Sequence, residues 1–150
     1  MRHDSRLSRV LHALIHMDGH EGRATSETIG HMLGTNAVVV RRTMAGLRDA
    51  GYVCSDKGPG GGWTLRCPLA EITLFDVYIA LGAPPVFALG LADDQPECLV
   101  EQAVNAAVGD ALGKAADALM TGLKAVNLAD VAHDFEQRSK RLSRHRRSAA

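Results

Sequence analysis

The stretch DKGPGGGWTLR (residues 56–66) carries the most distinctive chemistry in the sequence. Glycines at this density can bind a phosphate, close a hairpin or let the backbone approach another molecule closely. A phosphate-binding P-loop requires Gly-Lys-Ser/Thr between a strand and a helix, and the chain contains neither that sequence nor GxGxxG. A hairpin tip that contacts nucleic acid fits better, because Lys57 and Arg66 stand beside the glycines to meet phosphates. A loop without function is the alternative.

A second candidate is NAVVVRRTMAGLRDAG (residues 36–51), which has the apolar spacing of a helix. The residues expected to face the core are Ala37, Val40, Met44 and Leu47. The opposite side then exposes Val38 and Arg42, with Arg41 at the flank. Arginine suits guanine edges and phosphates, and valine can meet thymine methyl groups. A basic surface helix is often only solvated, so the neighbouring elements must decide between the two interpretations.

Histidine and cysteine give weaker signals. His12 and His16 have a spacing that can bind zinc, but HALIH lacks the glutamate of HExxH and no third ligand is evident, so we expect no metal site. Cys54, Cys67 and Cys98 are odd in number and form no CxxC pair, which argues against a disulfide framework. Cys98 opens a predicted helix, where the helix dipole favours thiolate and nearby acidic residues oppose it. It is a candidate redox sensor, and a packed apolar residue is an equally good interpretation.

The elements that position these residues follow from periodicity and capping signals. The sequence predicts a helix over about residues 5–17, a short helix capped by Thr25 or Ser26, and a longer helix capped by Asn36. A short helix, a glycine-containing turn and a longer helix form the outline of a helix-turn-helix. Strand-like runs at 52–55 and 63–66 then flank the glycines. A β-hairpin that directly follows a helix-turn-helix is the wing of a winged-helix domain.

The second half of the chain predicts helices without further strands. Thr73 and Asp76 resemble a capping box for a helix that ends near residue 82, and residues 84–96 form an irregular connection. A long Ala/Val-striped helix follows over 97–124, and we expect it to pair with a second copy rather than to pack on its own domain. Asn127 caps a last helix to about residue 135, and a basic tail, disordered or fraying, ends the chain.

The predicted fold class is therefore mainly α with a small β-hairpin (α+β), a winged helix-turn-helix domain followed by a long C-terminal dimerisation helix. Four segments follow: a DNA-binding domain (1–68), a linking helix and loop (69–96), the dimerisation helix with the short last helix (97–137) and a flexible basic tail (138–150).

The net charge of zero hides a division along the chain. Residues 1–67 carry nine Lys/Arg and six Asp/Glu (+3), residues 68–137 carry two and eleven (−9), and residues 138–150 carry six and none (+6). Apolar residues make up 46% of the chain and aromatic residues 4%, so the core must be built mostly from Ala, Val and Leu. No run approaches the roughly 20 apolar residues that span a bilayer, and the N-terminus lacks a signal-peptide pattern. We expect a cytoplasmic protein that does not bind membranes.

Three segments together resemble the Rrf2 family of winged-helix regulators, which includes IscR, NsrR and CymR. They are the wing signature GPGGGW with a following leucine (58–65), the preceding LRxAGYV (47–53) and the following EITLxDV (71–77). The resemblance covers residues 5–82 well and the long-helix half in outline. It implies a homodimeric DNA-binding repressor or activator, not an enzyme, with the third helix in the major groove of an inverted-repeat operator and the wing beside it.

By this resemblance, Val38, Arg41, Arg42 and Lys57 read the DNA. The full set of expected DNA-contacting residues is Thr25, Ser26, Asn36, Val38, Arg41, Arg42, Lys57, Gly58, Gly60, Gly61 and Arg66.

The sequence departs from the cluster-binding members of the family. Those members have three cysteines in the loop and at the start of the dimer helix, whereas only Cys98 matches here and residues 84–97 contain none. We therefore expect no iron–sulfur cluster. The signal is then a thiol switch at Cys98, a small molecule, or a partner enzyme docked on the acidic segment 68–137. The expected small-molecule pocket lies near Trp63, Tyr78 and Phe87.

Overall fold

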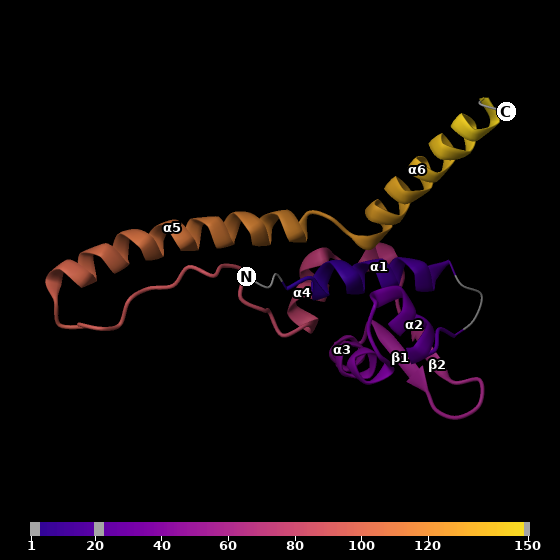
Figure 1. Cartoon of the computed structure of the whole chain (residues 1–150), viewed down its shortest axis with the longest axis horizontal. Coiled ribbons are helices and arrows are strands. Elements are labelled where there is room, and N and C mark those ends of the chain that lie inside the picture. Colours follow the sequence, from indigo (N-terminus) through magenta and orange to yellow (C-terminus); the bar gives the residue numbers. More distant parts are fainter. Residues whose placement is uncertain (1–3, 20–22, 149–150) are drawn as a thin grey trace.

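The computed structural model describes residues 4–19 and 23–148. Its elements, in chain order, are α1 (Arg6–Asp18), α2 (Ser26–Leu33), α3 (Ala37–Asp49), β1 (Val53–Asp56), β2 (Gly62–Leu65), the 3₁₀ helix η1 (Leu69–Glu71), α4 (Leu74–Ala80), α5 (Leu99–Lys124) and α6 (Leu128–Ser148). Helices α1 to α4 and the β-hairpin form one winged-helix body, from which α5 and α6 project in different directions (Figure 1). This confirms the predicted mainly α fold with a small hairpin and a long C-terminal helix.

Side-chain caps set where the helices of the helix-turn-helix begin. The Thr25 hydroxyl accepts a hydrogen bond from the Thr28 N–H at 3.1 Å. The Asn36 carboxamide oxygen accepts from Val38 N–H at 3.0 Å and from Val39 N–H at 3.1 Å. These bonds satisfy amide groups that have no partner inside the helix. Both helix starts were predicted from the sequence.

The core of the body lies where α1, α2, α3 and α4 meet. Val40, Met44 and Leu47 of α3 are buried, as their helical spacing predicts, while Ala37 is half-buried. Helix α3 approaches α4 so closely at Gly46 that a Cβ there would collide with the carbonyl oxygen of Ala80. The close contact fixes α3 against the body and leaves its other face to solvent.

The wing is a two-stranded antiparallel hairpin in which Val53 pairs with Leu65 and Asp56 with Gly62. The segment before α2 adds to this sheet, because Ala24 and Trp63 exchange backbone hydrogen bonds of 2.8 and 3.0 Å. The Trp63 indole is buried and donates to the Ser26 hydroxyl at 3.0 Å. The wing is therefore attached to the start of α2 by backbone and side-chain bonds.

Two capping boxes lie side by side where the two halves of the chain meet. Thr73 and Asp76 exchange side-chain bonds with each other's N–H at the start of α4, and Asn127 and Asp130 do the same at the start of α6. Backbone bonds connect the two boxes, from Leu74 N–H to Val126 C=O (3.0 Å) and from Leu128 N–H to Ile72 C=O (2.8 Å). The sequence predicted both caps, but it did not predict the backbone hydrogen bonds that join them.

Helix α5 contributes no buried residue. It points away from the body, and the connection from α4 runs back along its first turns (Figure 1), where the Asn105 side chain donates to the Ala92 carbonyl at 2.8 Å. The large apolar side chains exposed on α5 are Leu99, Val100, Val104, Val108 and Leu119. Within the described residues, no helix is long and apolar enough to cross a membrane.

The prediction for the C-terminus was wrong. Helix α6 does not end near residue 135 but continues to Ser148, so the basic segment is helical where a disordered or fraying tail was expected. The segment contains no glycine or proline and is rich in arginine, a good helix former. An ion pair one turn apart, Arg138–Asp134 at 2.7 Å, adds a small stabilisation. Residues 149–150 lie outside the described residues.

Candidate nucleic-acid interface

A groove of about 590 Å³ runs between the wing, the start of α2 and the exposed side of α3. Its lining residues are Thr25, Ser26, Glu27, Arg41, Arg48, Ser55, Asp56, Lys57, Gly58, Gly61, Gly62 and Trp63. Six residues predicted to contact DNA therefore share one surface, although they come from three separate elements: Thr25, Ser26, Arg41, Lys57, Gly58 and Gly61.

The wing tip presents backbone rather than side chains. Gly58 and Gly60 adopt positive φ angles of 86° and 76°, which favour glycine, and Gly61 N–H donates to Gly58 C=O at 2.9 Å. A Cβ at Gly61 would collide with the Asp56 carbonyl oxygen. The turn therefore needs glycine at these positions, and its surface consists of peptide groups next to the Lys57 ammonium.

Arg23 ties the wing tip to the segment before α2. Its guanidinium forms an ion pair with Asp56 at 2.7 Å and donates to the Gly60 carbonyl at 3.1 Å. Sequence reasoning missed this role, because both partners are distant in the chain and their proximity depends on the folded hairpin. The contact neutralises the Asp56 carboxylate, which would otherwise repel a phosphate near the tip.

The charge of the groove favours an anion. Arg41, Arg48 and Lys57 supply positive charge, and the carboxylates that line it are Glu27 and Asp56. Arg48 pairs with its neighbour Asp49 at 3.2 Å, and this carboxylate offsets part of its charge. Arg41 and Lys57 therefore remain as the cations that can meet successive phosphates along a nucleic-acid strand.

The other predicted DNA-contacting residues do not line the groove. Val38, 61% exposed, and Arg42 stand on the outward face of α3, where they can reach base edges. The Asn36 carboxamide oxygen is occupied in capping α3. Gly60 belongs to the wing tip, and Arg66 is exposed at the far end of the hairpin, where its N–H donates to the Tyr52 carbonyl at 2.9 Å.

The residues expected near a small-molecule pocket, Trp63, Tyr78 and Phe87, come from β2, α4 and the connection after α4. Trp63 lines the groove beside the wing, the Tyr78 hydroxyl donates to the Pro84 carbonyl at 2.9 Å, and Phe87 is 39% exposed in the connection. The Trp63 indole also attaches the wing to the start of α2 through its bond to Ser26.

The three cysteines are half-buried, and none of them forms a disulfide within the chain. Cys98 is the N-cap residue of α5, at the end of that helix far from the body (Figure 1). In the wing, the Cys54 sulfur lies 3.0 Å from the Thr64 hydroxyl. Burial, followed by the charges of Glu71 and Asp76, raises the pKa of the Cys67 thiol, so this group is held protonated at neutral pH.

Comparison with known proteins identifies the fold's relatives. The model of the Rrf2 family, described as iron-dependent transcriptional regulator, matches residues 3–134. YwnA of Bacillus subtilis (strain 168), assigned as an HTH-type transcriptional regulator, is 30% identical over 130 residues, 85% of this chain and 95% of its own. The family resemblance predicted from the wing and its flanking segments is thereby confirmed.

Solved structures show the same fold. A protein assigned as a transcriptional regulator from Lactobacillus plantarum superposes with a TM-score of 0.76 at 20% identity, covering 96% of this chain and 98% of its own. IscR from T. potens gives a TM-score of 0.66 at 19% identity over 91% of this chain and 90% of its own. CymR, named as the global cysteine regulator of B. subtilis, gives 0.60 at 22% identity over 89% and 97%.

The donor residues of this chain do not fit an iron–sulfur cluster. The loop 84–97 is fully described and contains no cysteine, which leaves Cys98 as a single thiol at the start of α5. Within residues 4–19 and 23–148, no three His, Cys, Asp or Glu side chains converge as a metal site. The matching family model, the curated relative and the shared winged-helix fold lead to one conclusion: the chain belongs to the Rrf2 family of transcriptional regulators, proteins that bind DNA, often as dimers, and are generally not enzymes.

Proposed function

We propose that this protein is a cluster-free, homodimeric repressor that binds an inverted-repeat operator through α3 and the wing. The observation that carries the proposal is the groove beside the wing, in which Arg41, Lys57 and the glycine tip face one surface. A repressor of this kind acts by occupying DNA that the transcription machinery needs.

Each part of the interface has a separate task. Val38 and Arg42, on the outward face of α3, meet base edges in the major groove and supply sequence selectivity. Arg41, Lys57 and the peptide groups of the wing tip meet phosphates and fix the register. The Arg23 contacts hold the tip in the conformation that presents those groups.

The exposed face of α5 supports a dimer. This helix of 26 residues is about 39 Å long and exposes Leu99, Val100 and Val104 among other apolar residues. Pairing with α5 of a second copy removes that surface from water. A two-fold dimer then presents two α3 helices to two half-sites of opposite orientation, which explains the inverted repeat.

DNA binding is tested by selecting genomic fragments with the purified protein and measuring affinity for the selected sequence by fluorescence anisotropy. Arg42→Ala should lose selectivity between the operator and random DNA, since it removes a base contact worth about 1–3 kcal/mol. Arg41→Ala should weaken binding to all sequences and reduce the salt dependence. Arg141→Ala, an exposed arginine on α6, is the matched control. Full affinity and selectivity in Arg42→Ala would contradict the assignment of α3.

The dimer is tested by analytical ultracentrifugation of Val104→Glu, which places a charge on the exposed face of α5. We expect a shift toward monomer and a loss of operator affinity, because the two half-sites are then bound independently. Asp110→Glu, a conservative change on the same helix, is the control. A monomeric wild-type chain with full operator affinity would contradict the dimer.

The signal proposed here is oxidation of Cys98, which is half-buried at the N-cap of α5 and therefore placed to alter the dimer helix. Peroxide, which oxidises one thiol to a sulfenic acid and is itself reduced to water, should lower the operator affinity of the wild type and leave that of Cys98→Ser unchanged. Equal affinity before and after oxidation would leave a small molecule, or a partner enzyme bound to the acidic segment 68–137, as the signal.

The absence of a cluster is tested separately. Anaerobic reconstitution of the protein with iron and sulfide should produce no absorption from a bound cluster in the visible spectrum.

A further inference from the structure

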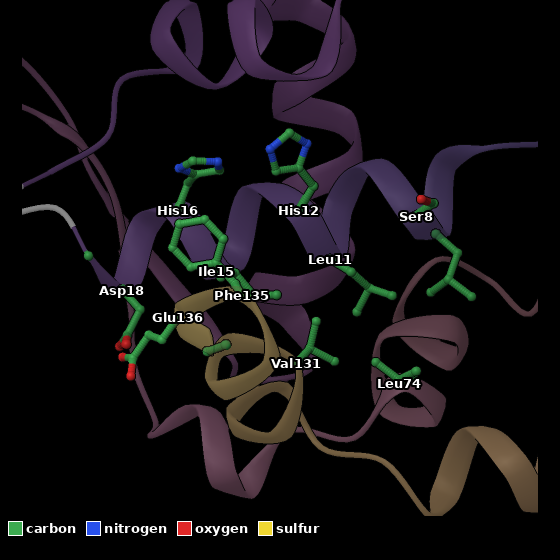
Figure 2. Close-up of a pocket in the computed structure, with 13 residues that line it drawn as sticks. Ser8, Leu11, His12, Ile15, His16, Asp18, Leu74, Val131, Phe135 and Glu136 are labelled. Atoms are coloured by element: carbon green, nitrogen blue, oxygen red, sulfur yellow. The ribbon is translucent and has the colours of Figure 1, made fainter. Parts of the chain in front are cut away.

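A second cavity, outside the DNA-facing groove, lies between α1 and the first two turns of α6 (Figure 2). Its volume is about 740 Å³, within the range of pockets that hold small molecules. Its lining residues are Leu7, Ser8, Leu11, His12, Ile15, His16, Asp18, Gly19, Leu74, Val131, Ala132, Phe135 and Glu136. None of these residues has a place in the DNA-binding function proposed above.

The floor of the α1–α6 pocket is apolar. Leu11 and Ile15, one turn apart on α1, form it together with Leu74 of α4 and Val131 of α6 (Figure 2). All four side chains are half-buried, and Leu11, Ile15 and Leu74 pack on the core with one side and leave the other open. A ligand with an apolar body would complete their burial.

An aromatic cluster forms one wall. The imidazole rings of His12 and His16 lie 4.7 Å apart, centroid to centroid, and the Phe135 ring lies 6.5 Å from His16. These separations are those of interacting aromatic rings, and a planar ring could join the cluster. Phe135 is 56% exposed, although a phenylalanine is usually buried, so the wall is incomplete in the isolated chain.

One end of the pocket carries negative charge. Asp18 at the end of α1 and Glu136 of α6 both lie there (Figure 2). The lining includes no lysine or arginine, and neither carboxylate forms an ion pair within the described part of the chain. Two carboxylates beside an apolar floor attract a positively charged group attached to an apolar body.

We propose that the α1–α6 pocket binds a small ring-bearing molecule with a positively charged group, an aromatic amine or a related planar cation. Its ring lies on the apolar floor against Phe135 and His16, and its cationic group faces Asp18 and Glu136. The pocket is separate from α5, because none of its lining residues belongs to that helix and α5 and α6 leave the body in different directions (Figure 1).

Occupation of the pocket affects DNA binding if the proposed function holds. Helix α1 packs against α2 and β2, which carry the DNA-facing groove, and α6 directly follows α5. A ligand that contacts α1 and α6 together fixes the direction of α5 relative to the winged-helix body. It therefore favours one spacing of the two α3 helices in a dimer over others, which is a coupling between ligand and operator.

Binding is tested first on the full chain without DNA, with three probes that share one ring system: 2-naphthylmethylamine, 2-naphthylmethanol and 2-naphthoate. Titrations are followed by amide NMR at about pH 8, where imidazoles are ordinarily neutral. We expect shifts at α1 and α6 and a dissociation constant on the order of 0.1–1 mM for the amine, as is usual for a fragment of this size. The alcohol should bind about three- to tenfold more weakly and the carboxylate more weakly still.

Variants separate the two parts of the site. Glu136→Gln and Asp18→Asn should reduce the preference for the amine over the alcohol about three- to tenfold while leaving alcohol binding unchanged. Phe135→Ala should weaken the binding of all three probes. Asp94→Asn, an exposed carboxylate in the connection, is the matched control and should change nothing. The four substituted residues are all exposed, and circular dichroism verifies that each variant is folded.

Four outcomes overturn the proposal: no binding at millimolar probe, equal affinity for the three probes, shifts confined to α5, or unchanged selectivity in both carboxylate variants. Contacts between Phe135 and a second copy, detected in a mixed-label dimer, would also overturn it by making the cavity a subunit interface. A separate anisotropy experiment with the selected operator, with and without the amine, tests the coupling. If the chain binds the amine but no DNA, the proposed function is wrong and the pocket proposal stands. If it binds DNA but not the amine, the pocket proposal is wrong and the proposed function stands.

Discussion

The winged-helix body and the α5 arm use apolar residues in opposite ways. In the body, Leu14, Ile29 and Leu47 are fully buried and belong to one core that also includes Leu128 at the start of α6. In the arm, no residue of α5 is buried, and large apolar side chains are exposed along the helix. Only its C-terminal end touches the body closely among the described contacts, where the Lys124 ammonium lies 4.5 Å from the centre of the Phe75 ring.

The difference shows which contacts each half needs. The body can reach a stable fold from its own chain, because its apolar surface is covered within the monomer. The arm cannot remove its apolar surface from water without another molecule, and most helical stability in proteins comes from the packing of an apolar face. Substitutions of the same type should therefore have different effects in the two halves.

The largest contrast is expected for truncation of apolar side chains. Leu47→Ala removes a fully buried side chain from α3 and should lower the free energy of unfolding by about 2–5 kcal/mol. Val104→Ala on the exposed face of α5 should change the unfolding of the body by less than about 0.5 kcal/mol and weaken self-association instead. Urea unfolding at fixed protein concentration measures both. Equal destabilisation by the two variants would show that α5 belongs to the same folding unit as the body.

Glycine-to-alanine substitution should have opposite signs in the two halves. Gly46→Ala should destabilise the protein by about 1–3 kcal/mol, because the new Cβ collides with the Ala80 carbonyl and forces α3 from α4. Gly113→Ala in α5 has open space around its Cβ and should stabilise that helix by about 0.5–1 kcal/mol. Thermal unfolding followed by circular dichroism distinguishes the two. A stabilising Gly46→Ala would mean that α3 and α4 separate easily.

The junction between body and arm should respond to loss of its caps. Thr73→Ala and Asn127→Ala each remove one cap, at an expected cost of about 1 kcal/mol in the free energy of unfolding. Because backbone bonds join the two caps, the double variant should differ from the sum of the single variants by about 0.5 kcal/mol or more. Thr121→Ala, an exposed threonine of α5, is the control. Additive effects would show that the two helix starts are independent.

The smallest expected effect concerns a thiol of the body. Burial raises the pKa of Cys67, so at about pH 8 it has less thiolate than an ordinary cysteine and should react more slowly with iodoacetamide than glutathione in the same tube. The rate should rise only as the pH passes the usual thiol pKa and approaches the raised value. Peptide mass spectrometry follows this site separately. Alkylation as fast as that of glutathione would contradict the protective effect of burial.

Features set by local sequence were predictable. Thr25, Asn36 and Thr73 each cap a helix through a bond to an amide two or three residues away, so residue type and position suffice to identify them. The buried side of α3 follows from helical spacing in the same way. The groove beside the wing was predicted in part, because the family resemblance supplied the relation between wing and α3 that local sequence lacks.

Features that depend on tertiary contacts were not predictable. The Arg23 contacts join residues that meet only after the hairpin has folded against α2. The bond from the Trp63 indole to the Ser26 hydroxyl likewise joins residues far apart in the chain. The length of α6 was missed for a different reason: charge clustering suggested disorder, although each residue of the segment is compatible with a helix.

The backbone junction between Leu74 and Val126 also affects how operators of this family could diverge. The chain leaves the body after Leu81 and returns at Val126, whose carbonyl is bonded to the first residue of α4. Exit and return are thus separated by one short helix, about 10 Å long. Whole turns could be inserted into or deleted from α5 without altering the packing of the body. In a dimer, such changes would alter the distance between the two α3 helices. The spacing between half-sites could then evolve independently of the bases that each α3 contacts.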